Sequence, residues 1–135
     1  LESEASAGTR LHLAAAYGAL VDGVYRTPVL LKGTEGRSWR VFSPATAQAL
    51  REALARVAVP TAHLPGYRLG GKTGTAETPG KRRGLEHAWY MGYGPTDGSP
   101  YPPLVVVAFF ENGGEGSRVA LPAVRKVMAA YWGIK

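Results

Sequence analysis

The residues best suited to chemistry are Lys72, Thr73, Gly74 and Thr75, which lie within the glycine-rich run 70–77 (GGKTGTAE). In an extended strand, Thr73 and Thr75 are two residues apart and share a face, so both hydroxyls can bond one carboxylate. Lys72 supplies a positive charge, and glycine at 74 lets a substrate backbone approach the strand edge. A backbone N–H of such a strand can also stabilise an oxyanion. These groups together suit a site that binds a substrate carboxylate.

A second interpretation of this run needs no ligand: a glycine-rich edge strand that carries a solvated lysine. Lys-Thr-Gly alone is a weak signal, because three common residues recur by chance. Alternation along a strand also puts Lys72 on the opposite face from Thr73, so the reach of the lysine depends on the strand's twist. The surrounding elements therefore have to decide between the two interpretations.

Three strands are predicted in the second half of the chain, at 67–77, 87–93 and 104–110. The last of these is an unbroken apolar run, which is typical of a central strand buried on both faces. Glycines at 113–116 (GGEG) suit a hinge between this strand and a helix. In the first half, the short β-prone runs 26–32 and 37–42 predict a small hairpin that turns at 34–36.

Three helices are predicted as well. The first covers roughly 10–22, with Thr9 as its N-cap and Gly23 after its end. The second begins at Ser43-Pro44, and the third begins near 118–121. The second helix has the apolar stripe Ala47, Leu50, Leu54 and Val57, with Arg51, Glu52 and Arg56 off that face. The third has the stripe Val124, Val127, Met128 and Tyr131, with Arg125 and Lys126 facing away.

This order of elements predicts an α+β fold, in which an antiparallel meander of three strands is covered by helices. Residues 1–66 are expected to be mainly helical with a small hairpin, and residues 67–135 to hold the three strands and the closing helix. The 135 residues are enough for one domain with a hydrophobic core.

Composition limits the alternatives. The sequence has no cysteine, which excludes disulfides and cysteine-ligated metals. His12, His63 and His87 lack partners at metal-ligand spacing, so we expect no metal and no cofactor. The net charge of +6 and the basic run 81–83 (KRR) leave open a second function class, a basic binding module for nucleic acid or an anionic glycan. A solvated loop explains the basic run better, and no nucleic-acid-binding pattern accompanies it.

Four further stretches resemble class B penicillin-binding proteins, the monofunctional transpeptidases. They are residues 10–23, 41–57, 87–95 (HAWYMGYGP) and 105–114, the last with the helical run 122–126. Lys-Thr-Gly is the third motif of serine penicillin-recognising enzymes. The stretch FENGG at 110–114 and the run His87-Ala-Trp are more similar to elongation-type enzymes than to septal ones. By this resemblance, the chain is the C-terminal portion of a transpeptidase domain, and its meander belongs to a larger, five-stranded sheet.

The resemblance implies a role for each residue of the motif. Lys72 would attract the substrate carboxylate and sit beside the serine of the family's second motif. Thr73 and Thr75 would hold that carboxylate, and the backbone N–H of Thr75 would form half of an oxyanion hole. Gly74 would permit close approach of the substrate.

Two family motifs are missing from this sequence, since it contains neither Ser-x-x-Lys nor Ser-x-Asn. The nucleophile and its lysine base are therefore absent, and a carboxylate clamp with an oxyanion hole cannot replace them. We expect the chain alone not to react with penicillin. Because half a domain should expose apolar surface and a sheet edge, we also expect it to self-associate.

For the parent protein, the resemblance implies a D,D-transpeptidase that cross-links peptidoglycan by serine acyl transfer. Its ligands would be the D-Ala-D-Ala end of a stem peptide and β-lactams, with no nucleic acid. A lipid-linked glycan polymerase would be its partner. The parent would be anchored in the bacterial inner membrane with this domain on the extracytoplasmic side. A β-lactamase relative is the remaining alternative, against which the stretch 87–95 argues.

Overall fold

The computed structural model describes residues 9–58, 60–76, 86–95 and 100–135. The chain forms two compact units, Leu1–Arg51 and Glu52–Lys135. Their boundary falls within helix α2 (Pro44–Val57).

The first unit contains the predicted hairpin. Strand β1 (Val24–Arg26) pairs antiparallel with β2 (Ser38–Arg40), and the rings of Tyr25 and Trp39 lie 4.8 Å apart across the pair. Both strands are shorter than predicted, and β1 begins two residues earlier than the predicted run. One backbone bond continues the pairing, from the Thr27 N–H to the Arg37 carbonyl at 2.9 Å.

Helix α1 (Thr9–Gly18) ends four residues before the predicted end. Turns follow it, and the Gly23 N–H donates to the Ala19 carbonyl at 2.7 Å. Arg51 caps the carbonyls in these turns. Its guanidinium donates to the carbonyls of Leu20 at 2.6 Å and Val21 at 2.8 Å. These carbonyls therefore bond a side chain from helix α2 instead of continuing the helix.

Helix α2 begins where the sequence predicts. The Ser43 Oγ accepts the Thr46 N–H at 3.1 Å, which is the expected N-cap bond. The predicted apolar stripe is wrong in part: Ala47 is fully buried, but Leu50 and Val57 are exposed. The prediction that Arg51 faces away from the packed side is also wrong, since it is half-buried and caps the carbonyls after α1.

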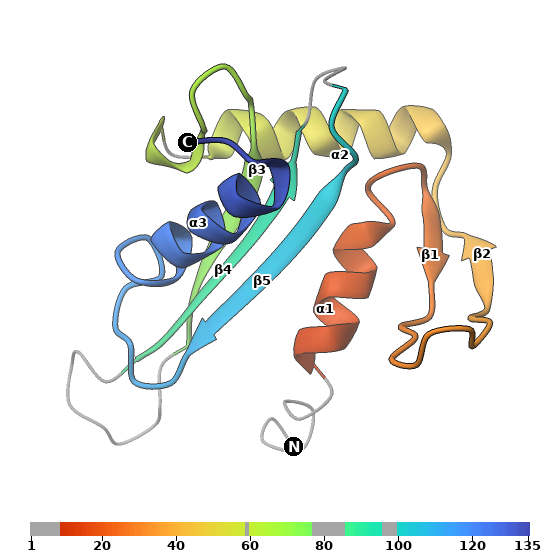
Figure 1. The fold of residues 1–135 in the computed structure, drawn as a ribbon, viewed down its shortest axis with the longest axis horizontal. Coiled ribbons are helices and arrows are strands. Elements are labelled where there is room, and N and C mark those ends of the chain that lie inside the picture. The colour runs from red at the N-terminus through yellow and green to blue at the C-terminus, as the bar shows by residue number, and fades with distance from the viewer. Residues whose placement is uncertain (1–8, 59, 77–85, 96–99) are drawn as a thin grey trace. The chain divides into compact units, whose positions relative to one another are not determined.

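The second unit is built on an antiparallel sheet in the order β3–β4–β5. Its strands are β3 (Gly70–Ala76), β4 (His87–Gly94) and β5 (Leu104–Phe110). Helix α3 (Ala120–Trp132) lies across one face of this sheet (Figure 1). The α+β meander predicted from the sequence is confirmed. The placement of β5 is not: it is an outer strand among the described residues, and its side chains are partly exposed.

The core of this unit lies between α3 and the sheet. It includes Leu69, Ala88 and Tyr90 from the sheet side. The buried side of α3 consists of Ala120, Leu121, Val124, Met128 and Trp132. Half of the predicted α3 stripe is therefore wrong, because Val127 and Tyr131 are 51% and 60% exposed.

Arg51 generates the first prediction. Replacing it with alanine is expected to lower the free energy of unfolding by about 1 to 3 kcal/mol, because the Leu20 and Val21 carbonyls lose a charged donor. Urea unfolding of the chain measures this change. The matched control is Arg56→Ala on the same helix, whose only described ion pair is an exposed one with Glu52 at 4.0 Å. That change should cost less than about 0.5 kcal/mol, and equal losses for both variants would contradict the capping role.

Candidate active-site strand

Strand β3 holds the four predicted site residues in one extended segment. Lys72, Thr73, Gly74 and Thr75 face Met91, Tyr90, Trp89 and Ala88 of β4 in antiparallel register. Within the described part of the chain, β4 is the only strand that pairs with β3. The other edge of β3 therefore keeps backbone groups that a ligand in an extended conformation can bond.

The register fixes which side chains share a face, because directly paired residues point to the same side of a sheet. Thr73 and Thr75 pair with Tyr90 and Ala88, which both belong to the core beneath α3. The two threonines therefore lie on the α3 side of the sheet, as alternation predicts. Neither threonine hydroxyl is hydrogen-bonded to another described residue.

Lys72 projects from the opposite face, where its pairing partner is Met91. Its side chain is exposed, and its Nζ donates to the carbonyl of the next residue, Thr73, at 3.0 Å. None of the described ion pairs involves Lys72. Its positive charge is therefore close to the backbone of Thr73 and is not neutralised by a described carboxylate.

Packing explains why β3 contains glycine at these positions, and sequence reasoning did not find this explanation. A Cβ at Gly71 would overlap the hydroxyl of Tyr90, and a Cβ at Gly70 would lie 3.1 Å from the Cβ of Leu54. At Gly74, a Cβ would lie 3.3 Å from the Cβ of Trp89, a tight contact across the strand pair. Glycine at 74 is thus favoured by packing as well as by the predicted approach of a substrate.

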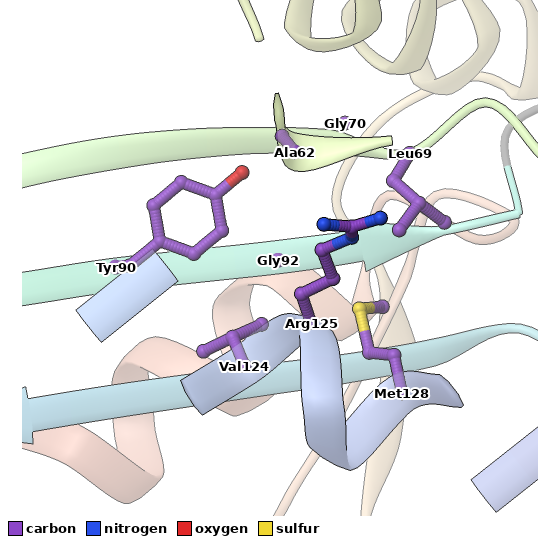
Figure 2. A pocket seen from close by; sticks show the side chains of 8 residues that line it. All are labelled: Ala62, Leu69, Gly70, Tyr90, Gly92, Val124, Arg125 and Met128. Carbon is purple, nitrogen blue, oxygen red and sulfur yellow. The ribbon is translucent and has the colours of Figure 1, made fainter. Parts of the chain in front are cut away.

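Tyr90 is the residue near the site that sequence reasoning missed. It extends from β4 with its hydroxyl toward β3, as Figure 2 shows. Its side chain is buried, and burial raises the pKa of the phenol to about 12. The phenol therefore stays neutral at physiological pH and supports the strand instead of exchanging protons. No sequence signal pointed to it, because the contact depends on the register of β3 and β4.

A narrow gap, too small to hold a water molecule, lies behind the start of β3, on the α3 side (Figure 2). Its lining is apolar except for Tyr90 and Arg125, and the Nε of Arg125 is buried without a partner among the described residues. The prediction that Arg125 faces away from the sheet is therefore wrong. Arg125 lies beside the Val124 and Met128 side chains that fill the core.

Two of the three histidines bond nearby backbone groups. No group of His, Asp or Glu among the described residues could hold a metal ion. His63 and His87 each accept a backbone N–H through Nδ1, from Leu69 and from Asn112, both at 3.0 Å. The basic run 81–83, which together with the net charge of +6 suggested a nucleic-acid or glycan module, lies outside the described residues.

The chain matches the family model of the penicillin-binding protein transpeptidase domain over residues 5–129. This chain belongs to that family. The transpeptidase match covers nearly the whole sequence, including β3, and confirms the predicted class B, elongation-type resemblance. Neither a basic binding module nor a β-lactamase is supported by the comparisons.

Two transpeptidases are similar in sequence. The peptidoglycan D,D-transpeptidase MrdA of Haemophilus influenzae is 42% identical over 77 residues, which is 48% of this chain and 11% of that protein. The peptidoglycan D,D-transpeptidase PbpA of Mycobacterium tuberculosis is 33% identical over 100 residues, which is 67% of this chain and 20% of that protein.

Solved structures agree with the family. A chain of a peptidoglycan synthase complex that coordinates polymerization and crosslinking is 56% identical, with a TM-score of 0.78 over 91% of this chain and 23% of that chain. Penicillin-binding protein A of M. tuberculosis, solved as a ceftriaxone acyl-enzyme, is 29% identical, with a TM-score of 0.74 over 90% of this chain and 32% of that chain. The chain thus spans from 11 to 32% of the length of these relatives.

The buried phenol gives the second prediction. Because the pKa of Tyr90 is about 12 in the folded state and ordinarily 10.0, the folded chain keeps a proton that the unfolded chain loses. The resulting stability is complete below about pH 10 and lost as pH rises to about 12, a fall of roughly 2 kcal/mol. Urea unfolding at several alkaline pH values measures it. Tyr90→Phe should remove this part of the pH dependence, whereas Tyr131→Phe, at a 60% exposed position, should retain it.

Proposed function

We propose that this chain is the C-terminal portion of a serine D,D-transpeptidase that cross-links peptidoglycan, and that β3 binds the end of its stem-peptide substrate. The observation that carries the proposal is the edge of β3 that no described strand pairs with, which has Lys72, Thr73, Gly74 and Thr75 in the middle of the strand. Membership of the transpeptidase family supports it. Residues 1–66 and 67–135 would be the helical and the strand-rich parts of this portion.

The reaction would be acyl transfer in two steps. A serine hydroxyl attacks the carbonyl of the penultimate D-Ala, the terminal D-Ala leaves, and a serine ester remains. The amine of a neighbouring stem peptide then attacks the ester, which frees the serine and forms the cross-link. The serine and its lysine base lie outside the present sequence, which contains no Ser-x-x-Lys.

Each group of β3 has a distinct part in this proposal. The hydroxyls of Thr73 and Thr75 donate to the carboxylate of the terminal D-Ala, and the Lys72 ammonium attracts it. The Thr75 N–H donates to the oxyanion of the tetrahedral intermediate. Gly74 keeps the strand edge low enough for the substrate backbone to lie against it. β-Lactams would bind in the same way, because they also carry a carboxylate beside a reactive carbonyl.

We also propose a partner and a location, which membership of the family supports. A similar chain belongs to a peptidoglycan synthase complex that combines polymerization with crosslinking. This supports a lipid-linked glycan polymerase as the partner and a role in cell elongation. The described residues contain no helix that is long and apolar enough to cross a membrane. We propose that the parent is anchored in the inner membrane and that this domain lies outside it, where its substrate is.

The third prediction separates binding from chemistry on the longer protein that contains this chain. Thr75→Val removes a hydroxyl but keeps the backbone N–H, so it should weaken binding of a penicillin before acylation by roughly tenfold. The acylation rate constant of the bound penicillin should change much less. Stopped-flow measurement with a fluorescent penicillin gives both constants.

Thr34→Val is the matched control, since Thr34 is exposed and lies in the other compact unit. It should leave both constants unchanged. The isolated 135-residue chain should remain unlabelled. An unlabelled longer protein would refute the proposed function, and labelling that is unaffected by Thr75→Val would refute the carboxylate role.

The outer edge of β5 gives the fourth prediction. Among the described residues only β4 pairs with β5, and the side chains of residues 104–109 are partly exposed. We expect the isolated chain to self-associate through this edge as its concentration rises. Light scattering measures the mass. Phe110→Lys, at a 38% exposed position, should reduce association by placing a charge at the edge. A monodisperse monomer at high concentration would contradict the prediction.

A further inference from the structure

The segment that joins β5 to α3 is fixed to the sheet, although its glycines predicted a hinge. The Gly114 N–H donates to the Glu86 carbonyl at 2.9 Å, and the Asn112 N–H donates to the Nδ1 of His87 at 3.0 Å. Both acceptors lie at the start of β4, and His87 pairs with Ala76 at the end of β3. The segment is therefore anchored over the end of β3 that holds Thr75.

Gly116 is the residue of this segment that packs against the backbone of both β3 and β4. It is buried, and a Cβ built on it would overlap the carbonyl oxygen of Trp89 and lie 3.0 Å from the carbonyl oxygen of Gly74. Both neighbours are backbone atoms, which cannot move aside as a flexible side chain can. The carbonyl of Gly116 accepts the N–H groups of Ala120 at 3.0 Å and Leu121 at 2.9 Å. Gly116 thus links the first turn of α3 to the backbone of β3 and β4.

The contact with Gly74 matters because of the peptide unit to which that carbonyl belongs. The Gly74 carbonyl and the Thr75 N–H are the two polar groups of one planar peptide, so the direction of one fixes the direction of the other. We infer that Gly116 is a positioning residue, which holds this peptide so that the Thr75 N–H points at the oxyanion. The inference rests on the proposed function, in which that N–H is the donor.

A variant at position 116 should therefore act on a different step from variants of the residues that bind the carboxylate. A methyl group at 116 displaces the Gly74 carbonyl and turns the Thr75 N–H with it. The threonine hydroxyls and the Lys72 ammonium, which bind the carboxylate, are not touched. Loss of a whole oxyanion donor costs about a hundredfold to a thousandfold in rate. A misdirected donor should therefore slow acylation by roughly tenfold to a hundredfold, with little effect on the binding that precedes it.

The test compares Gly116→Ala with Gly114→Ala in the longer protein that contains this chain. Gly114 has a φ of +78°, so alanine strains its backbone, but no atom outside the neighbouring residues lies within 4 Å of a Cβ there. Both variants should lose thermal stability. Only Gly116→Ala should lower the rate constant of acylation by a penicillin, and neither should change the dissociation constant of the complex before acylation.

The outcomes distinguish the inference from the function on which it rests. An unacylated wild-type protein refutes the proposed function. If Gly116→Ala is acylated as fast as the wild-type protein, the positioning role alone is overturned. The same holds if Gly114→Ala loses as much of the acylation rate as Gly116→Ala does.

If Gly116→Ala does not fold, Glu115→Ala replaces it. The Glu115 carboxylate accepts the Ser117 hydroxyl at 2.5 Å and pairs with Arg118 at 3.2 Å. Its loss should loosen the turn around Gly116 and slow acylation by about threefold, the size that exposed ion pairs allow. An unchanged rate in Glu115→Ala would then overturn the inference.

Discussion

Among the described residues β3 pairs only with β4, on one side, and this is the constraint on which the rest of the structure depends. A strand that serves a ligand must leave one row of backbone groups unpaired, yet those groups must not move. Hydrogen bonds along a single edge fix the strand's register but leave it free to twist away from its neighbour. The remaining rigidity has to come from contacts above and below the strand.

Glycine makes those contacts possible at three points of the sheet. The hydroxyl of Tyr90 comes against the backbone of Gly71, and Val124 and Met128 of α3 fill the space above Gly92. Gly116 lies on the carbonyl groups of Gly74 and Trp89. At each point a side chain or a turn occupies the volume that a Cβ would need. The high glycine content, 18 of 135 residues, therefore serves close packing as much as flexibility.

Sequence reasoning succeeded where the signal was local. The Ser43 cap depends on a serine and a proline in adjacent positions, and the strand around Lys72 depends on its own composition and the family resemblance. Sequence reasoning failed where a side chain's position depended on residues far away in the sequence. A helical pattern gives the spacing of apolar residues but not the direction they face, so Val127 was assigned to the core and Arg125 to solvent.

The contacts of Arg51, Tyr90 and Gly116 could not have been predicted for the same physical reason. Arg51 caps carbonyls that precede it by 30 and 31 residues. The position of Tyr90 beneath Gly71 requires the strand register, and the contact of Gly116 with Gly74 requires the path of a turn. Each is a backbone contact between segments that are far apart in sequence, and no composition or period encodes it.

The proposed site divides its work between side chains and backbone. In the proposed reaction, Lys72, Thr73 and Thr75 would present charge and hydroxyls to a carboxylate that is the same before and during the reaction, so they would add to binding at every stage. The Thr75 N–H would face an oxygen that becomes charged only in the transition state, so its direction would affect the rate. Side chains can adjust their rotamers to a ligand, but a peptide plane in a sheet cannot. A turn that packs on that plane, as the one at Gly116 does, therefore acts on the step that is least tolerant of error.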